Sequence, residues 1–162
     1  MLKSLARPAL LAIALVASAS TAQAQVTQTV TYAVNAINQI AFTGAPSLTI
    51  TTAVAGSAPT SVTNSASTWA ITTNQATVKI SASIASAMPT GLTLNASLAA
   101  PTLNGVSAGF LALGTTAVDL VTAIDKLAQS GMAVSYRLDA TAAAGVVTSA
   151  TKIVTYTISG GT

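Results

Sequence analysis

An all-β sandwich or barrel is the fold class that the sequence predicts, and three observations support this prediction. Short runs alternate apolar and polar residues with a period of two, as side chains do on the two faces of a strand. Clusters rich in glycine, proline and asparagine separate these runs and are typical of turns. The alternation of strands with long helices that marks a parallel sheet is missing. Since no linker interrupts the pattern, we expect one domain.

The longest alternating run covers residues 26–42. Seven of its nine even positions are apolar, whereas the odd positions are mostly polar or small. As one strand the run would span roughly 58 Å, about three times the usual strand length. Two interpretations follow. Either the run bends into two strands near residues 35–38, or its first part lies outside its own domain, free to complete a neighbour's sheet.

Shorter runs with one apolar face follow along the chain. They predict strands at residues 48–51, 68–72, 77–84, 92–98, 132–138 and 154–158. One further segment is ambiguous, because Val118, Val121, Ile124 and Leu127 have helical spacing while residues 117–124 also alternate as a strand. We expect a strand there, followed by a turn over residues 125–131, with a helix as the alternative.

The first 24 residues resemble a secretory signal peptide. Lys3 and Arg7 precede an apolar stretch over residues 8–16, and Ala22-Gln23-Ala24 fits an A-x-A cleavage site. The apolar stretch is shorter than the about 20 residues that span a bilayer, although an N-terminal membrane anchor is the alternative interpretation. We expect cleavage after Ala24 and a secreted chain, extracellular or on the cell surface, with no membrane span in the mature part (residues 25–162).

The residue types that carry most enzyme chemistry are scarce. The chain has no histidine, cysteine or glutamate, and its carboxylate side chains are Asp119, Asp125 and Asp139. Catalysis usually needs a positioned base, an activated nucleophile or metal ligands. The three aspartates lack the spacing of a calcium-binding loop. We therefore predict a protein that is not an enzyme, with no catalytic, cofactor-binding or metal site.

Charge is low and dispersed. Charged residues make up 6% of the chain, against about 25% in an average domain. Four scattered basic residues oppose the three aspartates in the mature part: Lys79, Lys126, Arg137 and Lys152. Nucleic-acid surfaces need clustered basic residues, so we predict no nucleic-acid partner. A nearly neutral Thr/Ser/Asn/Ala surface repels its own copies weakly, which favours self-association into a homopolymer.

Aromatic residues offer the main alternative to a purely structural role. Trp69 lies in phase with Ile71, which favours a place in the core, but exposed aromatic rings would suit carbohydrate stacking. Phe42, Phe110 and the three tyrosines are open to both interpretations. Asn95-Ala96-Ser97 matches a glycosylation sequon, but it falls within a predicted strand.

The end of the chain resembles a known group of proteins. Tyr136, the Ala/Thr-rich stretch 140–145 and Lys152-Ile153-Val154-Thr155-Tyr156-Thr157-Ile158 are similar to the closing hairpin of small exported bacterial β-sandwich subunits of the fimbrial and spore-coat-U-like type. The resemblance implies an immunoglobulin-like sandwich that assembles into surface fibres by strand exchange. The chain departs from such subunits in lacking their usual cysteine pair.

Together these observations predict a single immunoglobulin-like or jelly-roll-like β-sandwich, mostly antiparallel, that follows a cleaved signal peptide. The predicted function is that of a non-catalytic subunit of a surface filament, pilus-like fibre or matrix. Residues 25–35 are the expected donor strand for self-assembly, with Val26, Val30, Tyr32 and Val34 on its apolar face. The alternative is a secreted monomeric adhesin or carbohydrate-binding module.

Overall fold

The structure is a computed structural model that describes residues 23–161. The predicted signal peptide falls outside the described residues except for its last two positions. The described chain divides into two units, residues 23–33 and a β-sandwich that begins at Val34. Among the described residues, no helix has the length and apolar character that a membrane crossing requires.

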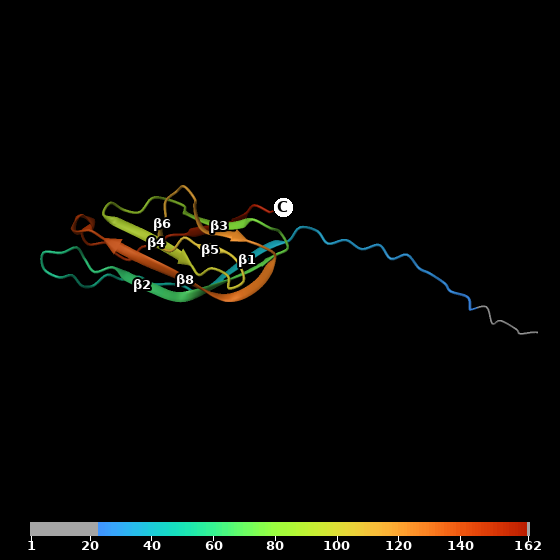
Figure 1. The fold of residues 1–162 in the computed structure, drawn as a ribbon. Helices are drawn as coiled ribbons and strands as arrows, with labels where there is room; N and C mark the ends of the chain where they lie inside the picture. Colours follow the sequence, from blue (N-terminus) through green and yellow to red (C-terminus); the bar gives the residue numbers. More distant parts are fainter. Residues whose placement is uncertain (1–22, 162) are drawn as a thin grey trace, which may run out of the picture. The chain divides into compact units, whose positions relative to one another are not determined.

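The sandwich consists of two sheets in which every strand pairing is antiparallel, which confirms the predicted fold class. The first sheet has the order β1 (Asn38–Thr43), β2 (Val62–Thr73), β8 (Leu127–Ala140), β4 (Leu92–Leu98) and β6 (Leu111–Ala112). The second has the order β5 (Val106–Ser107), β7 (Val118–Ile124), β3 (Val78–Ile84) and β9 (Val154–Ser159). Figure 1 shows β2, β8 and β4 as the long central strands of the first sheet.

The core lies between the two sheets and comes from the apolar phase of each alternating run. Its largest fully buried side chains are Trp69, Ile71, Ile80, Ile84, Leu98, Leu120, Ile124, Val78, Val121 and Val134. Ile40 and Phe42 of β1 and Tyr156 and Ile158 of β9 pack against this cluster from the sheet edges. The faces predicted for residues 68–72, 77–84 and 92–98 are confirmed, since burying apolar area stabilises only one register of each strand.

Connections after β2 run from one sheet to the other at every step. The turn residues after Thr73 therefore carry the chain across the sandwich and do not close a hairpin. The same holds for the connection between β8 and β9, which contains the short 3₁₀ helix η1 (Ala142–Ala144). The prediction of a closing hairpin at the end of the chain is wrong, because its two strands belong to different sheets.

Two predicted strands differ in the structure. Of the long run 26–42, only residues 38–42 lie in a strand, so the first of the two expected strands is absent from the described chain. Residues 48–51 form no strand, although Leu48 packs against the core. Leu48 lies in the 44–61 connection between β1 and β2, and these two strands already pair directly with each other.

The ambiguous segment forms a strand, β7, and the helical alternative is wrong. Leu120 and Val121 are adjacent but both buried, because the pairing of β7 with β3 shifts register at this point. The shift changes which positions face the core, so the apolar residues on either side of it have a spacing that resembles a helix. The expected turn over residues 125–131 is too long, since β8 begins at Leu127. Gly131, with φ +72°, lies at a register shift against β2 and lets the strand continue.

Candidate functional site

The predicted donor residues precede the sandwich or lie at its very start. Residues 23–37 contain no strand or helix. The exposed fractions are 92% for Val26, 74% for Val30, 90% for Tyr32 and 79% for Val34. An isolated exposed valine is ordinary, but four large apolar side chains at even positions, interrupted at Gln28, follow the pattern of one strand face.

Asn74 anchors residues 35–37 at the start of the sandwich unit. Its side-chain amide donates to the carbonyl oxygen of Asn35 over 2.8 Å and accepts from the backbone N–H of Ile37 over 2.7 Å. Its own backbone N–H donates to the Ile37 carbonyl. These contacts hold residues 35–37 beside the end of β2, so the sequence before Asn35 makes no part of this anchor.

Each sheet ends in one short strand and one longer strand. The short edge strands β5 and β6 have two residues each, and very short edges resist pairing with other chains. The longer edge strands β1 and β9 have six residues each, and in the described chain nothing pairs with their outer sides. Neither strand contains a charged residue or proline, which are the usual protections of an edge.

The unpaired backbone groups of these two edges follow from the antiparallel ladder. The Ala85 N–H donates to the Ile153 carbonyl, so alternate residues of β9 from 153 onward bond to β3. The outward backbone groups of β9 therefore belong to Val154, Tyr156 and Ile158. By the same reasoning, the bond from the Asn74 N–H to the Ile37 carbonyl leaves Asn38, Ile40 and Phe42 with outward groups in β1. Each edge presents three residues for pairing.

Aromatic rings close the core where β1 and β9 meet. Phe42 of β1 stacks on Tyr156 of β9 with ring centroids 3.8 Å apart, and on Trp69 at 6.2 Å. The hydroxyl oxygens of Tyr136 and Tyr156 lie 2.6 Å apart. Burial, together with this hydrogen bond, raises the pKa of Tyr156. The two open edges therefore lie on the same side of the sandwich, where the stacked rings of Phe42 and Tyr156 connect β1 to β9.

Most of the aromatic residues considered for carbohydrate stacking belong to this packing. Trp69 is 1% exposed and donates its indole N–H to the Ala99 carbonyl, which confirms its place in the core. Phe110 is 37% exposed, but the Arg137 guanidinium lies over its ring at 4.9 Å from the centroid. One face of that ring is therefore already covered.

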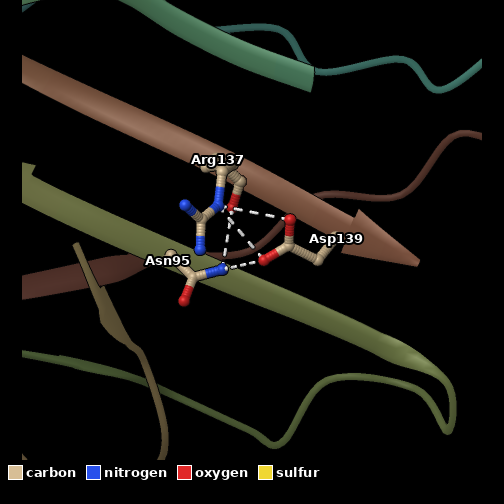
Figure 2. Close-up of polar contacts among 3 residues, drawn as sticks. All are labelled: Asn95, Arg137 and Asp139. Atoms are coloured by element: carbon tan, nitrogen blue, oxygen red, sulfur yellow. Dashed lines mark hydrogen bonds and ion pairs between the residues drawn. The ribbon is translucent and has the colours of Figure 1, made fainter. Parts of the chain in front are cut away.

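A polar cluster occupies the outer face of the first sheet (Figure 2), on β4 and β8. Asp139 accepts a hydrogen bond from the Asn95 amide over 2.7 Å, and Arg137 Nε lies 3.2 Å from its carboxylate. Asn95 is 5% exposed, and its amide nitrogen also lies 3.5 Å from the Arg137 carbonyl. The sequon asparagine is thus buried and engaged, which makes it a poor glycosylation acceptor.

This cluster should make stability depend on acid pH. A hydrogen bond from the Ser61 hydroxyl lowers the pKa of Asp139 below its ordinary 3.8; burial opposes the shift, and Arg137 and Asn95 add to it. The resulting stabilisation is complete above the pKa of an unfolded aspartate and is lost as pH falls through the lowered pKa. We expect Asp139→Asn to lose less stability than the parent between pH 7 and pH 2, as urea unfolding would measure. An equal loss in both proteins would contradict this assignment.

The other two aspartates are engaged separately. Lys79 pairs with Asp119 over 2.9 Å at an exposed site, and Asp125 accepts from the Thr77 backbone N–H. Among residues 23–161, no group of three or more potential metal-binding side chains comes together. Asp139 is the aspartate that pairs with Arg137.

Lys152 is the lysine that the fold brings to a serine. Its ammonium nitrogen lies 2.8 Å from Ser86 Oγ, 2.8 Å from the Ala87 carbonyl and 3.3 Å from the Ser86 carbonyl. The three acceptors match the three N–H donors of an ammonium group. The contact ties the β3–β4 connection to the residues that lead into β9.

Comparison with protein-family models, curated proteins and solved structures finds no match for this chain. The resemblance to fimbrial and spore-coat-U-like subunits therefore stays a prediction. In residues 23–161, the open edges β1 and β9 are the feature that the sequence patterns did not predict, because strand order decides which strands are edges.

Proposed function

We propose that this protein is a non-catalytic, extracellular structural subunit that forms a surface filament or matrix by β-strand addition. Residues 25–35 of one copy act as the donor strand and pair with an open edge of the next copy. Main-chain hydrogen bonds supply most of the contact, and the alternating apolar side chains set its register.

The observation that carries this proposal is that one chain contains both unpaired sheet edges and an alternating segment that is in no sheet. The sandwich has two uncharged six-residue edges, β1 and β9, with unpaired backbone groups. The same chain has an uncharged alternating segment that takes no part in a sheet. Unprotected edges of this kind are templates for another strand. A donor strand satisfies the edge and buries its own apolar face in the same step.

Side-chain spacing supports the fit. Val30, Tyr32 and Val34 alternate at the two-residue spacing of Ile40 and Phe42 in β1, and of Tyr156 and Ile158 in β9. A strand added along either edge extends the inner apolar layer, because opposite side chains lie on the same face. Full burial of one valine side chain contributes about 1.5–3 kcal/mol. Burial of the four donor side chains therefore favours association.

Removing residues 25–35 tests the proposal. We expect the purified deletion variant to stay folded and to form no polymers, because β1 begins at Asn38 and the Asn74 contacts with Ile37 remain, although the contact with the Asn35 carbonyl is lost. The parent protein is expected to form polymers under the same conditions, which light scattering and electron microscopy would detect. A matched control replaces residues 25–34 with a Gly/Ser segment of equal length, which keeps the chain length but removes the strand face. Polymers that persist in both variants would rule out this segment as the donor.

A further inference from the structure

The sequence of β9 is symmetric in side-chain type about Tyr156. Reading outward from the tyrosine, a threonine stands on each side, and a β-branched aliphatic residue stands beyond each threonine, Val154 and Ile158. An antiparallel pair of identical strands places each residue opposite the residue at the mirrored position. A strand that is symmetric in this way is therefore complementary to itself.

The backbone groups follow the same symmetry. Val154, Tyr156 and Ile158 carry the outward N–H and C=O groups of β9, as the ladder to β3 requires. In an antiparallel pair of two β9 strands centred on Tyr156, that residue meets its own copy and Val154 meets Ile158. Each outward group then has a partner, and the inward side chains of both copies stay on the core side.

The side chains that meet in this register are favourable pairs. Tyr156 faces Tyr156, Val154 faces Ile158, and the exposed Thr155 faces the exposed Thr157 on the outer surface. Aromatic pairs, β-branched pairs and threonine pairs each stabilise neighbouring strands. No charged residue lies in the strand to oppose the contact.

The ends of β9 limit the pairing to this stretch. Lys152, the nearest charge along the chain, lies outside β9 and is bound by Ser86 and Ala87. At the other end, Gly160 has φ +83°, and a Cβ at this position would lie 2.6 Å from the Thr77 carbonyl oxygen. The chain turns there in a conformation that glycine permits, so the strand ends at Ser159, one residue beyond Ile158.

We propose that β9 pairs antiparallel with β9 of a second copy of this chain, with a two-fold axis at Tyr156. The contact joins two four-stranded sheets into one continuous sheet and leaves β1 as the edge that receives a donor strand. This self-pairing goes beyond the strand donation proposed above and does not depend on residues 25–35. It gives the protein a second, lateral contact, by which filaments associate side by side.

Cysteine cross-linking tests the register directly, because the parent chain contains no cysteine. Thr155 and Thr157 are expected to face each other across the axis, whereas two copies of Thr155, or two of Thr157, lie diagonally apart. We expect a mixture of the Thr155→Cys and Thr157→Cys proteins to form a disulfide-linked dimer under oxidised glutathione. Each protein alone should cross-link at most a tenth as fast, and Ala133→Cys, exposed on the interior strand β8, serves as the collision control.

Both variants are tested with and without residues 25–35, and circular dichroism verifies that each is folded. The same mixture-specific cross-link after the deletion supports the self-pairing, whatever the deletion does to fibres. Equal cross-linking in the single proteins and the mixture, no cross-link in the mixture, or a cross-link that disappears with residues 25–35 would overturn it. Thr157→Lys, which places a charge on the edge, should also abolish any dimer seen by sedimentation.

Discussion

Replacing Val26, Val30, Tyr32 and Val34 with serine is expected to abolish polymers while the sandwich stays folded. These four side chains form the apolar face of the proposed donor strand, and all are highly exposed. Serine keeps the backbone donors and acceptors but removes the apolar area whose burial drives association. Sedimentation velocity and electron microscopy of the purified variant would measure the loss, and thermal unfolding would verify the fold.

The opposite face of the same segment supplies the matched control. Serine at positions 27, 29, 31 and 33 changes as many residues but leaves the apolar face intact. Those variants should polymerise like the parent, because residues on the other face of an added strand remain in solvent. If both faces prove equally important, or neither matters, then the segment does not act as a strand with one buried face.

The second large effect concerns the core. Trp69→Ala should lower the free energy of unfolding by about 3–5 kcal/mol, because it leaves a large cavity. Trp69 is 1% exposed, stacks on Phe42 and donates to the Ala99 carbonyl. For a domain of ordinary stability this is a large fraction of the total. Urea unfolding at neutral pH gives the measurement.

Leu103→Ala provides the comparison, since Leu103 is 82% exposed and its truncation should change stability by less than about 0.5 kcal/mol. A Trp69→Ala variant as stable as Leu103→Ala would show that the tryptophan does not support the core. It would also reopen its alternative interpretation as a ligand-stacking residue.

The sequence predicted the parts of the fold that depend on local alternation. The apolar faces of β3 and β4, and the in-phase burial of Trp69 and Ile71, follow from one-sided burial of a pleated strand. Residues 48–51 show the limit of that reasoning. Alternation over so few residues is compatible with a strand, but β1 and β2 pair directly and leave the connection between them outside the sheet.

Local sequence patterns could not predict the order of the strands or the positions of the bulges. The two buried neighbours Leu120 and Val121 follow from a register shift against β3, which depends on a strand about 40 residues away along the chain. The free edges of β1 and β9 likewise depend on which strands pair, and so does the meeting of Phe42 with Tyr156. The candidate donor residues were named from sequence alone, but the edges that accept a strand emerged only from the topology.

The most direct test of the account is electron microscopy of the purified chain from Gln25 onward, over a range of protein concentrations. If sheet edges are the working surfaces of this molecule, filaments or laterally joined sheets appear, and their number grows with concentration. Single particles the size of one chain at every concentration, with the amides of β1 and β9 fully protected from hydrogen exchange, would contradict it.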